Sequence, residues 1–291
     1  MICNYRIAPI LKNPYAGATI MKRNMSILSG LVFTTSATMS SFMIAGMAER
    51  MGSKYPKYRL REIKAPPNIK SLIHSSTNLI TDIKQKFNYL SSSEKIAGSI
   101  ILLNSVVFLL WQFPSMQVSM FSNMVNYKSA KVYTLLTNIF SQRDFISFAI
   151  TNYVLWGNIQ DMVNFHMGKH QFLAFYMSSG VIASYLSYLL KVTAGLGSFA
   201  SGPYSSLFAL FGYLSETNKN SYVSLFGFGS FRMQNLFWIF MGIDLFSLMG
   251  LFTISLGSSG SFFGGLFGVL YARYFQRYLW DYRHKYLKFF K

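Results

Sequence analysis

The sequence predicts an all-α membrane protein in which one N-terminal transmembrane helix precedes a bundle of six. Of the 291 residues, 52% are hydrophobic and only 12% are charged, whereas a soluble domain carries about 25% charged residues. The stretch from Met25 to Ala48 carries no charge, and about 20 apolar residues are enough to span a bilayer. Six further apolar segments follow at about 95–113, 144–165, 171–192, 201–215, 232–251 and 258–279.

By composition the chain divides into three parts. Residues 1–48 are basic, rich in Ser and Thr and free of acidic residues, which is typical of a mitochondrial targeting segment, and they include the first transmembrane helix. Residues 49–94 form a polar, basic linker, in which apolar residues at helical spacing from Ile69 to Phe87 predict an amphipathic helix. Such a helix lies on an anionic leaflet or against a neighbouring protein. Residues 95–291 form the six-helix membrane domain with a basic C-terminal tail.

The net charge of +18, from 27 Lys and Arg against 9 Asp and Glu, indicates an anionic membrane surface as a partner. The basic residues gather in the N-terminal third and at the C-terminus, where they flank apolar stretches, as in membrane anchors. We therefore expect contact with anionic lipid and a bound phospholipid such as cardiolipin. No nucleic-acid partner is expected, because no basic stripe interleaves with exposed aromatic residues on a polar segment.

Metal chemistry has little support in the sequence. Cys3 is the only cysteine, so the chain can form neither an internal disulfide nor a cysteine-based zinc site. His166 and His170 are four residues apart, but the Met-Gly-Lys sequence between them predicts a turn in a loop between helices. We therefore expect no metal and no cofactor other than lipid.

Four stretches, taken in order, carry a resemblance to a known family: Leu103 to Trp111, Tyr153 to Trp156, Gly168 to Gly195 and Gly264 to Tyr271. Their order and spacing resemble the rhomboid intramembrane serine proteases, and within them the mitochondrial presenilin-associated type, over roughly residues 95–291. That type has one additional N-terminal helix before a six-helix core. The resemblance implies a multi-pass protein of the mitochondrial inner membrane with its N-terminus in the matrix.

At the family's catalytic positions this sequence departs from the pattern. A rhomboid uses a Ser in a Gly-x-Ser-Gly turn at the start of the fourth helix and a His on the sixth, and donors on the second helix hold the oxyanion. On this alignment Tyr204 stands in place of the Ser and Ser261 in place of the His. The second helix carries Gln142, Ser147 and Thr151 where the family has His, His and Asn.

These replacements predict that the chain is not an enzyme, because residues 171–283 contain no histidine to serve as a base. The leading hypothesis is a non-catalytic pseudoprotease that acts as a structural or assembly subunit of a mitochondrial inner-membrane complex, with the respiratory chain as the first candidate host. Its partners are then other membrane-protein subunits. A second hypothesis is a client-binding pseudoprotease in membrane-protein translocation or quality control. A third is an active serine protease with a rewired site at Ser205, Ser206 or Ser261.

Two other features of the apolar segments point to helix packing and to an intramembrane charge. Small residues let transmembrane helices approach closely, so we expect the sixth helix of the core to pack on the fourth through the glycines at positions 202, 260, 264 and 268. Asp244 is an acid well inside an apolar run, where a charge is costly and marks a functional or pairing role. It is expected to pair with Arg232 or Arg143, or to cap a helix near the interface.

Overall fold

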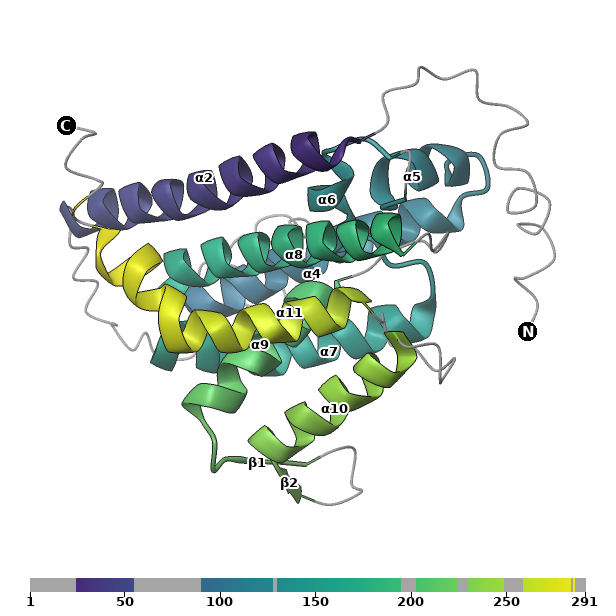
Figure 1. The fold of residues 1–291 in the computed structure, drawn as a ribbon. Coiled ribbons are helices and arrows are strands. Elements are labelled where there is room, and N and C mark those ends of the chain that lie inside the picture. The colour runs from purple at the N-terminus through teal and green to yellow at the C-terminus, as the bar shows by residue number, and fades with distance from the viewer. Residues whose placement is uncertain are drawn as a thin grey trace, which may run out of the picture.

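Helices make up almost all of the chain that the structure describes (Figure 1). The computed structural model describes residues 25–54, 90–127, 130–194, 203–224, 230–248, 259–283 and 285. The long helices are α2 (Ile27–Lys54), α4 (Ser92–Gln112), α7 (Phe145–Asp161), α8 (Gly168–Thr193), α9 (Tyr204–Thr217), α10 (Met233–Leu248) and α11 (Ser259–Leu270). Shorter helical elements are α5 (Gln117–Met124), α6 (Thr134–Thr137), η2 (Asn138–Phe140), η3 (Met162–His166), η4 (Tyr271–Phe275) and η5 (Arg277–Asp281).

Each predicted apolar segment overlaps one of the long helices, in the predicted order, so the predicted all-α bundle is confirmed. Within the described residues, three helices are long and apolar enough to cross a membrane, namely Ile27–Gly52, Ser92–Gln112 and Gly168–Thr193. Two parts of the fold were not expected. The segment between α4 and α7 folds into short helices, and β1 (Tyr222–Ser224) pairs antiparallel with β2 (Ser230–Arg232) between α9 and α10.

Local signals fix where the helices begin. Ser91 caps α4 through a reciprocal capping box, in which Glu94 N donates to Ser91 Oγ at 3.2 Å and Ser91 N donates to Glu94 Oε2 at 2.6 Å. Asp144 caps α7, because its carboxylate accepts from the backbone of Ser147 at 2.7 Å. Gly168 has a φ of 71°, a conformation that glycine adopts without a steric penalty. This bend separates η3 from α8.

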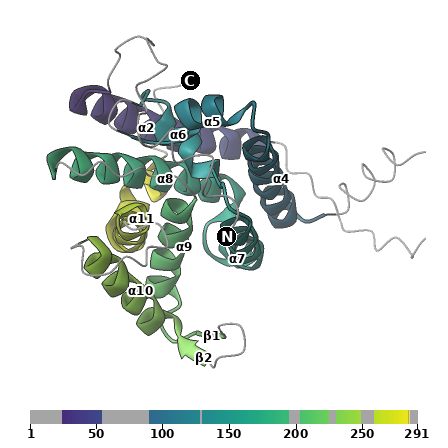
Figure 2. The ribbon, with the colours of Figure 1, turned by 90° about the vertical axis from the view of Figure 1, so that its right-hand side faces the viewer.

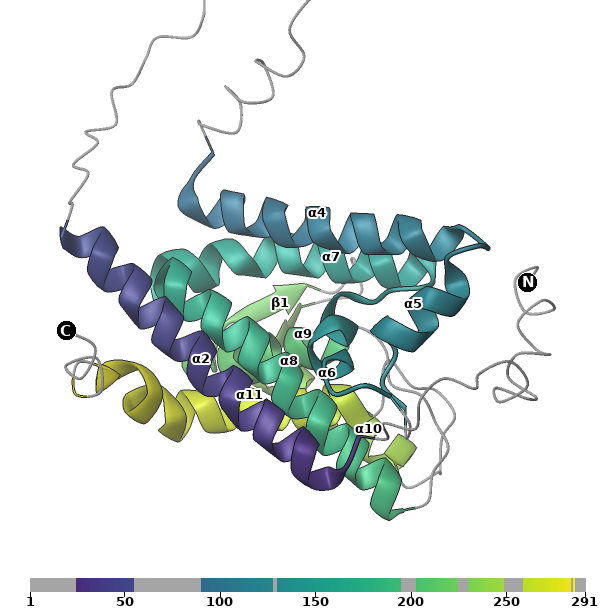
Figure 3. The same ribbon diagram turned by 90° about the horizontal axis from the view of Figure 1, so that it is seen from above.

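Helix α2 packs along α8 on the outside of the bundle, as Figures 2 and 3 show. Tyr188 Oη donates to the carbonyl of Met25 at 2.6 Å, and Tyr185 Oη donates to that of Ile27 at 3.2 Å. At its other end Phe42 stacks on Tyr271, which lies in η4. The helix continues to Lys54, past the boundary at residue 48 that the sequence suggested. The amphipathic helix predicted at 69–87 lies outside the described residues.

Several charged contacts gather where the last helix ends, at what we call the C-terminal end of the bundle. It is marked by the ion pairs Arg283–Glu49 and Arg273–Glu216, each at 2.7 Å. Helices α2, α7, α9 and α11 end there, and α4, α8 and α10 begin there (Figures 1 and 3). At the opposite end α9 begins at Tyr204.

Helices α9 and α11 make the closest helix contact in this region. A Cβ on Gly264 would run into the carbonyl oxygen of Ser205, and a Cβ on Gly268 into that of Ala209. Gly260 differs, because a Cβ there would meet Ser205 Cβ at 3.8 Å, an ordinary contact. The predicted packing of the sixth core helix on the fourth is therefore present, with Gly264 and Gly268 as the required glycines, and Gly202 lies outside the described residues. Gly212 of α9 is a further position where only glycine fits, because it faces the backbone of Gly265. The sequence pattern did not predict this position.

Candidate functional site

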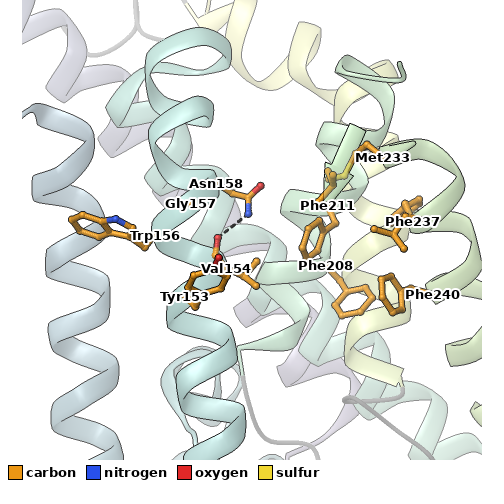
Figure 4. Close-up of a pocket in the computed structure, with 12 residues that line it drawn as sticks. Tyr153, Val154, Trp156, Gly157, Asn158, Phe208, Phe211, Met233, Phe237 and Phe240 are labelled. Carbon is orange, nitrogen blue, oxygen red and sulfur yellow. Dashed lines mark hydrogen bonds between the residues drawn. The ribbon is translucent and has the colours of Figure 1, made fainter. Parts of the chain in front are cut away.

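An apolar pocket of about 420 Å³ lies between α7 and α10, with α9 as its base (Figure 4). Figure 4 shows the phenyl rings of α9 and α10 on one side of this space and Tyr153 and Val154 of α7 on the other. The lining residues come from these three helices and from β1: Tyr153, Val154, Trp156, Gly157, Asn158, Phe208, Phe211, Val223, Met233, Leu236, Phe237 and Phe240.

The chemistry of the lining suits apolar side chains. Asn158 Nδ2 donates to the carbonyl of Val154 at 2.8 Å (Figure 4), so this amide is already satisfied within its own helix. Phe208 of α9 and Phe240 of α10 meet edge to face with ring centroids 6.2 Å apart. Tyr153 is 69% exposed, which leaves the pocket open along the outer side of α7. A pocket with this lining accommodates apolar groups.

The positions that correspond to the rhomboid nucleophile and oxyanion donors lie near the start of α9 and on the first turns of α7. Tyr204 is half-buried and hydrogen bonded to Ser147 of α7. Thr151 lies one turn further along α7, fully buried, and its hydroxyl finds no hydrogen-bond partner in the described chain. Gln142 precedes α7 instead of lying on it, because the helix begins only after the Asp144 cap. The structure therefore brings Tyr204 and Ser147 together and leaves Gln142 outside the helix.

Two serines follow Tyr204, and they point to different neighbours. Ser205 faces Gly260 of α11, and its buried hydroxyl has no hydrogen-bond partner among the described residues. Ser206 Oγ donates to the carbonyl of Tyr176 on α8 at 2.9 Å. The hydroxyl of Ser206 is thus used in a hydrogen bond between helices. The hydroxyl of Ser205, beside the first turn of α11, makes no hydrogen bond to a described residue.

Asp244 meets Ser261 inside the bundle. Its side chain is only 3% exposed, and the hydroxyl of Ser261 on α11 is hydrogen bonded to its carboxyl group. The predicted pairing with an arginine is wrong. Arg232 Nε donates to Tyr222 Oη at 3.4 Å in the hairpin, and Arg143 lies over the ring of Trp111 at 5.5 Å. A carboxylate beside a hydroxyl can accept its proton, which is how a general base activates a serine.

The two histidines with helical spacing lie away from this group. His166 Nε2 is 3.2 Å from Asn218 Nδ2, and its ring meets Tyr213 edge to face. His170 lies beyond the bend at Gly168, on α8. Both histidines are therefore near the C-terminal end of the bundle, where His166 hydrogen bonds to Asn218 and packs on Tyr213.

Residues 129–278, more than half of the chain, match the rhomboid domain family. The chain belongs to the rhomboid family. It is 36% identical over 120 residues to the mouse presenilin-associated rhomboid-like protein, mitochondrial, covering 40% of this chain and 32% of that protein. The human protein of the same name is 35% identical over 116 residues, covering 39% and 30%. The zebrafish presenilin-associated rhomboid-like protein A, mitochondrial, is 33% identical over 119 residues, covering 40% and 31%.

The matched part of this rhomboid-like chain spans about a third of the length of these relatives. No solved structure matches the chain. The names of the relatives, together with the three helices that are long and apolar enough to cross a membrane, support a mitochondrial membrane protein.

Family membership corrects the expectation that the chain is not an enzyme. A rhomboid domain, with presenilin-associated rhomboid-like proteins as relatives, points to an intramembrane protease. The replacements at Tyr204 and Ser261, and the lack of a histidine in residues 171–283, remove the family's Ser–His dyad only. The structure places Ser205 and an Asp244–Ser261 pair around the same helix ends, so loss of the family's dyad does not establish loss of catalysis.

Proposed function

We propose that this rhomboid-like chain works in the mitochondrial inner membrane by binding a transmembrane segment of a partner protein in the pocket between α7 and α10. The observation that carries the proposal is the pocket itself, whose lining is almost wholly apolar and aromatic and which stays open along α7. In lipid, helices associate through close van der Waals packing and a few polar contacts. A pocket of about 420 Å³ takes a few apolar side chains from one face of such a helix.

Filling the pocket from within tests this proposal. Gly157 lines the pocket, and a Cβ there would meet no atom within 4 Å, so Gly157→Leu places a side chain in the pocket without a clash. Gly98 on α4 is an equally open helical glycine outside the pocket lining, which makes Gly98→Leu the matched control. A photoreactive residue at position 240 should crosslink to a partner segment in the wild-type chain and in Gly98→Leu, and not in Gly157→Leu. Equal crosslinking in all three chains would contradict the proposal.

For the partner we propose subunits of a larger inner-membrane complex, with a respiratory-chain assembly as the first candidate. Large apolar side chains on the outer face of α2, such as Leu28 at 70% and Ile44 at 66% exposure, support a long membrane-embedded contact with lipid or neighbouring subunits. The alternative is a changing set of client proteins in translocation or quality control. Native gels of gently solubilised mitochondria, followed by mass spectrometry, separate the two. One large complex of constant composition supports the subunit, and a low-mass or variable band supports the clients.

A second candidate function, favoured by one observation, is proteolysis within the membrane. The hydrogen bond between Ser261 and Asp244 offers a hydroxyl nucleophile next to a carboxylate that can accept its proton. A serine-directed fluorophosphonate probe should then label the full chain in native membranes. The label should be lost in Ser261→Ala and kept in Ser206→Ala, because the hydroxyl of Ser206 is engaged with Tyr176. Absence of any label would remove this candidate and leave the binding function standing.

A further inference from the structure

The carboxylate of Asp244 continues the pocket-lining face of α10. Met233, Phe237 and Phe240 line the pocket and recur at intervals of four and three residues, so they share one face of the helix. Asp244 follows Phe240 by four residues and therefore lies one turn further along that face. An apolar segment that rests on this face of α10 thus approaches a carboxylate at the end of the pocket.

The hydrogen bonds of this carboxylate are incomplete. Asp244 is 3% exposed, Ser261 is hydrogen bonded to its carboxyl group, and Oδ2 has no hydrogen-bond partner in the described parts of the chain. A carboxylate inside a membrane is costly, and acids at such depth pair with basic groups or face a functional path. Removing a charge from water without a matching partner is unfavourable. One neutral hydroxyl satisfies this group only in part.

In the described parts of the chain, no Lys, Arg or His forms an ion pair with Asp244. Arg232 is the last residue of β2, directly before α10 and at the end of that helix far from Asp244. It donates a hydrogen bond to Tyr222 in the hairpin, and Arg143 lies over the ring of Trp111. Lys191 is in the last turn of α8. A molecule that occupies the pocket can supply the positive charge that would complete the Asp244 site.

We propose that the transmembrane segment bound between α7 and α10 carries a lysine or arginine that pairs with Asp244. This inference rests on the proposed function, and it names the class of partner: an apolar helix with one basic residue placed to reach the end of the pocket beyond Phe240. The four-carbon stem of a lysine lies along apolar surface while its ammonium group reaches a polar partner. The pocket thus selects for helical, apolar shape, and Asp244 selects among such helices by charge.

Synthetic transmembrane peptides test this directly with the full chain in lipid nanodiscs. Leucine-rich peptides of about 20 residues, long enough to span the bilayer, carry a photoreactive group and either Lys, Leu or Glu at one position, which is moved along the peptide. At the matching position the Lys peptide should crosslink about tenfold more than the Leu peptide, since interhelical polar contacts contribute about 1–2 kcal/mol. Asp244→Asn should abolish this preference and keep the Leu crosslink. Asp244→Lys should reverse the preference toward the Glu peptide.

The controls separate this inference from the function on which it rests. The Leu and Lys peptides could crosslink equally to the wild-type chain, with Gly157→Leu blocking both. The pocket would then bind helices without any selection by Asp244, so this inference would fail while the proposed binding function would stand. If no peptide crosslinks and Gly157→Leu changes nothing, the binding function fails as well. A Lys preference that persists in Asp244→Asn also overturns the inference. Asn has nearly the same shape as Asp, so this variant remains informative even where Asp244→Lys does not fold.

Discussion

Gly264 of α11 lies directly against the backbone carbonyl of Ser205 on α9. The contact fixes how closely the two helices approach at the level where the family carries its nucleophile and base. Ser205 lies on α9 and Ser261 on α11. The close approach of these two helices therefore sets the distance between the two serines. The geometry of the candidate site thus depends on a backbone contact that a single methyl group would break.

Gly264→Ala is therefore expected to destabilise the bundle. Overpacking a tight contact usually costs about 1–3 kcal/mol, and here the methyl group would meet backbone atoms, which cannot rotate away. Thermal unfolding in mild detergent should show a lower midpoint than that of the wild-type chain.

Gly260→Ala is the matched control for that variant. Its new Cβ would meet Ser205 Cβ at 3.8 Å, an ordinary contact, and alanine has a higher helix propensity than glycine. The midpoint should stay the same or rise. Equal losses in Gly260→Ala and Gly264→Ala would contradict the helix register described above.

Asn104 of α4 and Asn152 of α7 form a buried side-chain hydrogen bond of 2.9 Å between Nδ2 and Oδ1. We expect Asn104→Leu and Asn152→Leu each to lower stability, because each leaves its partner buried without this bond. The double variant should lose less than the sum of the two. Double-mutant cycles of such pairs in a membrane protein average about 0.6 kcal/mol of coupling, with a maximum near 1.7. Unfolding midpoints of the four chains would measure this, and strict additivity would show that the bond contributes nothing.

Helix order and the α9–α11 contact were predictable from the sequence because both have local signals. Apolar segments separated by polar turns mark helices, and glycines every fourth residue mark a close helix face. The Asp244–Ser261 contact has no such signal, because the two residues belong to different helices and meet only through packing. Gly212 was missed for a related reason: a lone glycine in a helix does not reveal that another backbone lies against it. The pocket could not be predicted for the same reason, because it depends on the distance between α7 and α10 in the folded chain.

For the inner-membrane location that we propose, the distribution of basic residues predicts the orientation of the chain. Of the 13 Lys and Arg residues that the structure describes, three lie at the end of the bundle where α9 begins: Lys131, Arg143 and Lys191. The others fall in segments at the C-terminal end of the bundle. Basic residues stay preferentially on the side from which a segment inserts, so the C-terminal end should face the matrix. This is the reverse of the orientation that resemblance to the family implies.

A tag at the C-terminus measures this orientation. In mitoplasts, where the inner membrane is intact and its outer side is accessible, protease should leave the C-terminal tag protected and should remove a tag placed before α2. A matrix protein serves as the control for membrane integrity. Protection of the N-terminal tag and loss of the C-terminal one would show that the family orientation holds and that the charge distribution does not set it.

Thr151 allows a measurement of how much a buried hydroxyl without a hydrogen-bond partner lowers the stability of the fold. Its hydroxyl is fully buried on α7 without a hydrogen-bond partner in the described chain, and such a group costs about 1–3 kcal/mol. Thr151→Val keeps the shape and removes the hydroxyl, so we expect it to raise stability by about 1 kcal/mol. Thr34 on α2 is the control, because its hydroxyl donates to the carbonyl of Gly30 at 2.8 Å and Thr34→Val should lower stability by about 0.5–1 kcal/mol. A loss of stability like that of Thr34→Val would mean that the Thr151 hydroxyl is already bonded in the folded chain.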